Sequence, residues 1–154
     1  MKNKKEFLKQ KFIEFQLKID ELSLALKKQE QMFRDRERET DLHLFELVDS
    51  FENINENIKA KQQHFDKTTR MLVRNMGSIE RKIIRYLEAN GKFQMEFPDN
   101  KARMDYCEVV EVREMPALEN ETILSVVKKG YIDGNINTVL RKAQVVTVLN
   151  SADS

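Results

Sequence analysis

The sequence predicts an α+β protein in which a long helical part is followed by a small all-β domain. From Glu6 to Asn90 the chain holds one glycine and no proline, and helix-forming residues dominate. Within that stretch large apolar residues recur every seven positions, which is the spacing of a helix face covered by another helix. After Gly91 apolar and polar residues alternate instead, as is typical of strands.

The heptad row occupies seven positions of the helical part. Residues that repeat every seven positions fall on nearly the same side of a helix, so the row forms a seam that another helix must cover. The chain has little else with which to cover it, and we therefore expect a homodimer. The predicted dimerisation residues are Leu44, Phe51, Ile58, Phe65, Leu72, Ile79 and Tyr86.

An earlier apolar seam runs from Leu8 to Leu26 in steps of four and three, the a/d pattern of a coiled coil, and continues to Phe33. The step from Phe33 to Leu44 spans 11 residues, a stutter that unwinds a supercoil without ending the helix. We expect the long helix to turn back near residues 59–64. A second helix is expected to end at Asn90-Gly91, where glycine supplies the left-handed cap. Residues 1–90 are thus the predicted dimerisation domain.

Residues 91–154 are predicted to form the β-domain, which would bind a partner. Alternation indicates a first strand at 92–97 and a second at 106–113. Residues 123–132 are expected to form one strand, joined by a hairpin turn at 133–135 to a partner strand at 139–149. Valines are frequent in the last strand, as suits a sheet.

The charge and hydropathy patterns exclude several partners. The 27 basic and 26 acidic side chains give a net charge of +1 and are mixed along the chain, so we expect no nucleic-acid partner. No apolar run approaches the roughly 18 residues that a membrane-spanning helix needs. The start of the chain lacks the apolar core of a signal peptide. These features predict a cytoplasmic protein without a membrane partner.

The candidate chemical groups do not form a pattern that predicts catalysis. Cys107 is the single cysteine and has no histidine close in sequence, so a buried structural thiol is expected. His43 and His64 are 21 residues apart with no cysteine nearby, which does not suit a metal site. The carboxylates lie among lysines and arginines at helical spacings, as on solvated faces. The sequence therefore predicts a binding or scaffolding protein, with no enzyme activity, metal or cofactor.

Three features of the chain resemble the GrpE family, the nucleotide-exchange factors of DnaK-type heat-shock chaperones. The stretch from Ile123 to Tyr131 ends in Lys-Gly-Tyr, and after a turn the stretch from Leu140 to Val148, Leu-Arg-Lys-Ala-Gln-Val-Val-Thr-Val, is similar to the family's Arg-x-Ala-x-Val-x-Val strand. In the helical part, residues 44–52 are similar to a Leu-Leu-Pro-Val-Leu-Asp-Asn-Leu-Glu type of segment in the family. The order of the parts also agrees, and the resemblance covers roughly residues 41–149.

The resemblance implies a homodimer of paired long helices and a helical bundle, with a β-domain on each protomer. In the family a β-domain holds the nucleotide cleft of the chaperone open, so that ADP leaves. It implies that the partner contact lies at, or is supported by, Lys129, Gly130, Tyr131 and Arg141. An alternative gives these residues internal roles: close strand packing for Gly130, core packing for Tyr131 and a structural role for Arg141.

The chain departs from the family pattern in three places. The family carries Asp-Pro-x-x-His before its second strand, whereas here residues 99–106 lack that proline and Met104 stands in place of the histidine. Glu46 replaces a proline in the helix segment, and residues 22–28 take the place of an arginine-rich stretch. These departures motivate a second hypothesis, a non-exchanging dimeric coiled-coil adaptor that keeps the GrpE scaffold for another partner.

Overall fold

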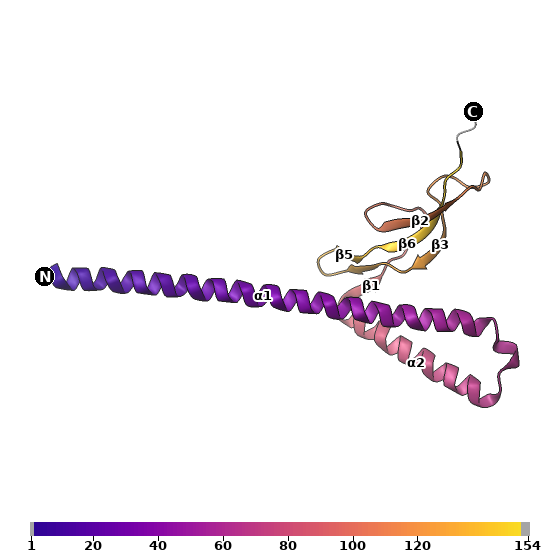
Figure 1. Ribbon diagram of the computed structural model, residues 1–154, viewed down its shortest axis with the longest axis horizontal. Helices are drawn as coiled ribbons and strands as arrows, with labels where there is room; N and C mark the ends of the chain where they lie inside the picture. The colour runs from indigo at the N-terminus through magenta and orange to yellow at the C-terminus, as the bar shows by residue number, and fades with distance from the viewer. Residues whose placement is uncertain (1, 152–154) are drawn as a thin grey trace. The chain divides into compact units, whose positions relative to one another are not determined.

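The computed structural model describes residues 2–151 and has the predicted α+β order of elements (Figure 1). Within this described range two helices and one 3₁₀ turn come first, and six strands follow. The elements are α1 (Lys2–Lys59), η1 (Gln62–His64), α2 (Lys67–Ala89), β1 (Lys92–Gln94), β2 (Cys107–Arg113), β3 (Ile123–Lys128), β4 (Tyr131–Asp133), β5 (Thr138–Arg141) and β6 (Ala143–Val148).

The chain divides into two compact units, the first ending at Thr40 and the second beginning at Asp41. The described part of the first unit is entirely α-helical, and among residues 2–40 only Lys11 is not classed as exposed. The charged run before Asp41 is helical, as the stutter predicted. The second unit contains the rest of α1, α2 and all six strands, so the predicted division after residue 90 separates its helical part from its β part.

The turn between the two helices lies where the sequence predicted it. The amide of Lys61 donates to the carbonyl of Ile58 (2.9 Å) as α1 ends, and η1 follows. The carboxylate of Asp66 then caps α2 by accepting a hydrogen bond from the Thr69 amide (2.7 Å). At the other end, Asn90 is the C-cap and Gly91 has a positive φ of 76°, the left-handed conformation that was expected there.

The strands form two three-stranded sheets, and this corrects the predicted strands. The first sheet has the order β1-β4-β5 with antiparallel pairs; in the second, β2-β6-β3, β2 runs parallel to β6. The predicted single strand 123–132 is wrong, because the chain leaves the second sheet after Lys128 and enters the first at Tyr131. The predicted strand 139–149 is likewise divided between β5 and β6. The hairpin turn between β4 and β5 is confirmed.

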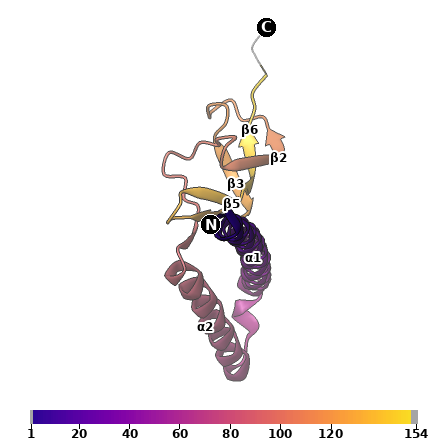
Figure 2. The ribbon, with the colours of Figure 1, turned by 90° about the vertical axis from the view of Figure 1, so that its left-hand side faces the viewer.

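Two apolar clusters hold the second unit together. One joins the helices to the first sheet through Phe45, Val48, Leu87 and Tyr131. The other lies within the β part and contains Cys107, Ile123, Ala143 and Val145. From Asp41 onwards α1 therefore lies between α2 and the strands, as Figure 2 shows. Burial of these apolar side chains provides the main stabilisation of the unit.

Candidate functional site

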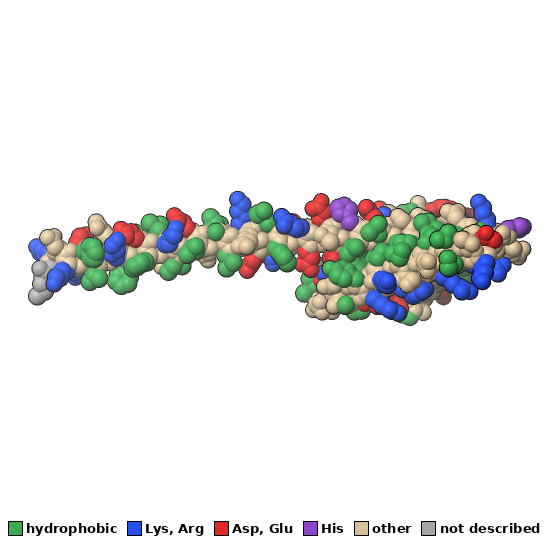
Figure 3. Space-filling view, turned by 90° about the horizontal axis from the view of Figure 1, so that it is seen from below, with side chains coloured by type: hydrophobic (Ala, Val, Ile, Leu, Met, Phe, Trp, Pro, Cys, Tyr) green, Lys and Arg blue, Asp and Glu red, His purple; other side chains and the backbone are tan. Residues whose placement is uncertain are grey.

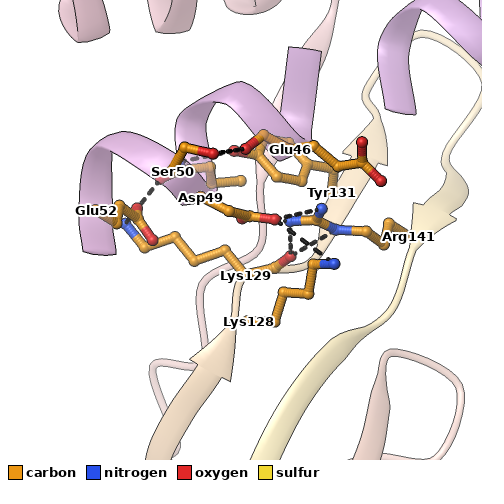
Figure 4. A network of polar contacts seen from close by, with 9 residues as sticks. Glu46, Asp49, Ser50, Glu52, Lys128, Lys129, Tyr131 and Arg141 are labelled. Atoms are coloured by element: carbon orange, nitrogen blue, oxygen red, sulfur yellow. Dashed lines mark hydrogen bonds and ion pairs between the residues drawn. The ribbon is translucent and has the colours of Figure 1, made fainter. Parts of the chain in front are cut away.

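The four residues predicted to contact a partner lie together where the β part meets α1, and Figure 4 shows three of them, Lys129, Tyr131 and Arg141. Lys129 and Gly130 connect β3 to β4, Tyr131 begins β4, and Arg141 ends β5. They lie close to one another because β4 and β5 pair with Tyr131 opposite Arg141. We call this contact region, with Phe45, Asp49 and Glu52 of α1, the helix–sheet joint.

Arg141 forms the polar centre of the joint. Its Nη1 and Nη2 atoms each donate to a carboxylate oxygen of Asp49 at 2.8 Å, a bidentate pair between residues 92 positions apart. Its Nε and Nη2 atoms also donate to the carbonyl oxygen of Lys129, at 3.1 and 2.8 Å. The arginine side chain is only 14% exposed. A planar guanidinium can make these contacts together, whereas a lysine ammonium cannot.

Tyr131 forms the apolar centre of the joint. Its ring stacks on that of Phe45 with centroids 3.8 Å apart, and the guanidinium of Arg141 lies 5.2 Å from the Tyr131 ring centroid. The Tyr131 hydroxyl accepts a hydrogen bond from Gln94 Nε2 (3.0 Å). Burial raises the pKa of Tyr131, so the phenol stays protonated at neutral pH. The ring is therefore a core residue that fixes the β part to α1.

Gly130 is buried at the point where the chain crosses between sheets. A Cβ atom there would lie 2.5 Å from the sulfur of Met95 and 2.6 Å from the backbone nitrogen of Ala143. No side chain fits in that space, because real Cβ atoms do not approach other atoms so closely. The structure thus gives Gly130, Tyr131 and Arg141 the internal roles of the alternative interpretation.

Lys129 is the most accessible of the four predicted residues, with a side chain that is 44% exposed. Its Nζ atom lies 2.6 Å from a carboxylate oxygen of Glu52 and donates to Gln94 Oε1 at 3.3 Å. The neighbouring Lys128 lies 3.7 Å from Asp49. Lys129 and Lys128 therefore add exposed ion pairs at the rim of the joint, where such pairs contribute little to stability.

A second polar anchor, which the sequence reasoning missed, joins the helices to the first sheet. The Nζ atom of Lys92 lies 2.8 Å from Asp133 and 3.4 Å from Asp41, and all three residues are buried. Burial lowers the pKa of Lys92, but the Asp133 hydrogen bond and the attraction to both carboxylates outweigh it and leave the pKa raised. The Lys92 hydrogen bond lowers the pKa of Asp133. No local sequence pattern marks this anchor, because its members come from three distant segments.

The predicted dimerisation row is split between the two helices, with the division where it was expected. Leu44 packs at the edge of the Phe45 cluster, and Phe51, Ile58 and Phe65 are half-buried. The α2 residues Leu72, Ile79 and Tyr86 are 54%, 49% and 58% exposed. The face of α1 that is buried within the chain carries Asp41, Phe45 and Val48 instead. The α2 half of the row is thus available to another chain.

The N-terminal seam is wholly uncovered in the single chain. Each of its apolar side chains is more than half exposed, and Figure 3 shows apolar side chains along this part of α1. Grooves beside Phe33 are lined by Leu26 and Gln29 on one side and by Ala25 and Met32 on the other. The members of the seam are Leu8, Phe12, Phe15, Ile19, Leu22, Leu26 and Phe33.

The two edge strands of the β2-β6-β3 sheet expose valines that the sequence reasoning did not select. We call Val110, Val112, Val126 and Val127 the valine patch; Val127 is 62% exposed. Register shifts interrupt both edge strands, between Val109 and Glu111 in β2 and between Val126 and Lys128 in β3. Such irregularities turn side chains away from the regular alternation. Two exposed valines on each edge strand, with β6 between the two strands, make these edges candidates for a contact surface.

The segment that departs from the GrpE pattern lies beside a groove of about 450 Å³. Met95, Phe97, Pro98, Tyr106 and Ile132 form much of its lining. Asp99 accepts a hydrogen bond from Arg103 Nη2 (2.8 Å), and Met104 is highly exposed. This segment therefore presents a methionine to solvent, without an ionisable imidazole.

The remaining candidate chemical groups are the single cysteine and the possible metal ligands. Cys107 is a buried free thiol packed with Ile123, Ala143 and Val145. Within residues 2–151 no three histidine, cysteine or acidic side chains are grouped as metal ligands would be. In the same range neither helix has a stretch long and apolar enough to cross a bilayer. Comparison with models of known protein families gave no match, and comparison with curated proteins gave none either.

Proposed function

We propose that this chain is a homodimeric, GrpE-like nucleotide-exchange factor that promotes ADP release from a DnaK-type chaperone. The main support is a contact between the two stretches that carry the resemblance. Residues 44–52 and the Lys-Gly-Tyr and Arg positions resemble the family separately, and they are about 80 residues apart. In the structure they meet, because Phe45 stacks on Tyr131 and Asp49 binds Arg141.

The uncovered seams support the homodimer. Residues 2–40 of the first unit form no apolar core of their own, and an isolated helix whose apolar seam faces water gains little stability. A second copy supplies an equal seam, so pairing buries the a/d residues of both chains in a coiled coil. The exposed α2 residues Leu72, Ile79 and Tyr86 extend the interface into a helical bundle in this proposal.

Exchange by such a protein needs differential binding and no catalytic group. A factor that binds the open nucleotide cleft more tightly than the closed one shifts the chaperone towards the open state and speeds ADP release. The β part must then be held rigidly against the helices. The bidentate Asp49–Arg141 pair and the Lys92 anchor are suited to that task because both join the β part to α1.

We propose that the valine patch contacts the chaperone. Lys129, at the rim of the helix–sheet joint, would make a further contact. Gly130, Tyr131 and Arg141 would act indirectly, by fixing the orientation of the strands. The valines of the patch are accessible, and the two edge strands that carry them are both paired with the central strand β6. Glu108 and Glu111 lie in the same edge strand as Val110 and Val112, and they give the patch a polar rim.

The alternative function is a dimeric adaptor that does not promote exchange. The segment 99–106 favours it, since it contains no histidine and exposes Met104. A pull-down with a DnaK-type chaperone distinguishes the two functions. Exchange predicts capture of the nucleotide-free or ADP-bound chaperone and release on addition of ATP, whereas an adaptor for another partner predicts no capture in any nucleotide state.

The valine patch gives this experiment a matched pair of variants. Val127→Asp places a charge on the patch without disturbing a buried residue, and we expect it to abolish capture of the chaperone. Val127→Thr keeps the size and β-branching of the side chain and should retain most of the binding. Equal capture by both variants would show that the contact lies elsewhere.

A further inference from the structure

Helix α2 carries a row of cationic side chains along one side. Its members follow one another at spacings of three, four, seven and four residues, which places them on one face of the helix. They are Lys67, Arg70, Arg74, Arg81 and Arg85, and all are exposed. With Lys82, α2 has six basic residues against two acidic ones, a net charge of +4 in a chain whose total is +1.

The cations of this row lack the ion pairs with acidic residues of the same chain that exposed helix faces commonly have. Within residues 2–151 none of these six cations lies in an ion pair, whereas in α1 Lys11 pairs with Glu14 and Lys18 with Glu21. Like charges three or four residues apart repel one another. The first turn of α2 contains no acidic residue, although acidic residues are favoured there. Apart from the Asp66 cap at its N-terminus, this arrangement of charges is unfavourable for α2 alone.

The cationic row and the apolar face of α2 point in opposite directions. Leu72, Met76, Ile79, Ile83 and Tyr86 form the apolar face by the same helical spacing. Figure 3 shows Lys and Arg side chains gathered along one margin of this region, beside exposed apolar side chains. If a second chain covers the apolar face, the cationic row stays accessible. The two surfaces can therefore serve different partners.

The row begins beside a hollow that has both cationic and apolar walls. A cavity of about 570 Å³ lies between Lys67, Arg70 and Arg74, with Phe65 and Met71 as its apolar lining. A partner with carboxylates at helical spacing and one apolar side chain would match the row and the hollow together. Arginines are well suited to such carboxylates because their guanidinium groups bind them in bidentate geometry.

Two other anionic partners fit less well. A helix on a bilayer buries its apolar face in the membrane, but the apolar face of α2 packs in part against α1 through Ile83 and is covered by the second chain in the proposed dimer. A long nucleic acid would extend beyond the row over residues 41–66, which hold six acidic residues against two lysines. A short acidic protein segment meets the row alone. We propose that the cationic row of α2 is a docking surface for an acidic amphipathic segment of a partner protein.

The test uses the full-length protein and a labelled helical peptide with glutamates three and four residues apart and a central leucine, read by fluorescence anisotropy at low salt. The triple variant Arg70→Gln, Arg74→Gln, Arg81→Gln should bind about tenfold more weakly, since three exposed charge pairs are lost. The matched variant Lys4→Gln, Lys5→Gln, Lys9→Gln changes the net charge equally in α1, and its binding should change less than about twofold.

Three outcomes would overturn the proposal. They are no binding of the glutamate peptide, an equal loss in both triple variants, or tighter binding of duplex DNA or of phosphatidylserine vesicles that depends on the same arginines. Met71→Ser provides a second check, because it should weaken the leucine-containing peptide and leave a peptide with serine in place of leucine unchanged. Circular dichroism of each variant confirms that α2 is retained. This surface is independent of the proposed exchange activity.

Discussion

The carboxylate of Asp49 in α1 accepts two hydrogen bonds from the guanidinium of Arg141 in β5, both at 2.8 Å. Because the pair is little exposed and joins distant parts of the chain, it fixes the β part to the helix at a defined position. Lys129 contributes its carbonyl oxygen to the same guanidinium. Together with the Tyr131–Phe45 stack and the Lys92 anchor, this pair therefore fixes the orientation of the strands.

Replacing Arg141 by lysine should destabilise the second unit by roughly 1–3 kcal/mol, because the charge is kept but the bidentate pair is lost. Urea unfolding followed by circular dichroism measures the change. Arg113→Lys is the matched control, since Arg113 forms an exposed pair with Glu111 and its replacement should leave the unfolding midpoint nearly unchanged. Equal effects at the two positions would mean that the Asp49 pair is not a structural anchor.

The substitution of Gly130 by alanine should destabilise the protein by about 1–3 kcal/mol, because the added methyl group meets Met95 and the Ala143 backbone. Gly77 in α2 offers an opposite control. A Cβ there makes only an ordinary 3.5 Å contact with Arg81 Nη1, so Gly77→Ala should stabilise the helix by about 0.4–1 kcal/mol. Thermal melts of both variants should therefore shift in opposite directions, and a stable Gly130→Ala variant would contradict the close crossing.

The Lys92 anchor predicts a pH dependence of stability at both ends of the range. The lowered pKa of Asp133 means that its contribution is present above the ordinary value of 3.8 and is lost as pH falls through the folded pKa. The raised pKa of Lys92 means that its contribution is present below 10.5 and is lost as pH rises through the folded pKa.

The variant Lys92→Met tests this dependence, because it removes the cation that both carboxylates approach. We expect lower stability at neutral pH and a smaller fall in the urea midpoint on acidification to about pH 3, since protonating Asp133 then costs less. Urea titrations at several pH values measure both effects. Parallel pH profiles for the variant and the unchanged protein would argue against the anchor.

The proposed coiled coil predicts that a charge in the N-terminal seam weakens dimerisation without unfolding the second unit. Leu22→Asp buries an unpaired carboxylate in a paired seam, and the dissociation constant should rise at least about tenfold. Sedimentation velocity gives the oligomeric state. Gln31→Asp, an exposed change away from the seam, should leave the dimer intact. A monomeric unchanged protein at micromolar concentration would contradict the seam argument itself.

The main elements could be predicted from the sequence because their signals are local. Helical spacing and the absence of proline predicted the helices, and Asn90-Gly91 predicted the end of α2. The division of the predicted strand 123–132 was missed because no proline or turn sequence interrupts that stretch, while the change of sheet depends on which distant strand each half pairs with. The sequence pattern indicates which residues pack against another part of a protein, but it does not identify the residues against which they pack.

The same limit applies to the candidate site. Lys129, Gly130, Tyr131 and Arg141 were selected together and do lie together, but Gly130 and Tyr131 are buried against other parts of the same chain and Arg141 is only 14% exposed. Burial of Tyr131 by Phe45 is a contact between residues 86 positions apart, which spacing within either segment cannot indicate. In the valine patch, Val110 and Val127 lie at two strand irregularities that no local motif marks.

The most direct test of the proposed function is the rate of labelled-ADP release from a DnaK-type chaperone, measured by stopped-flow fluorescence at increasing concentrations of the protein. The proposal predicts that release accelerates and saturates, and that Val127→Asp abolishes the acceleration while Val127→Thr retains it. An unchanged release rate at saturating concentration, with the chaperone shown to be active, would contradict the assignment as an exchange factor.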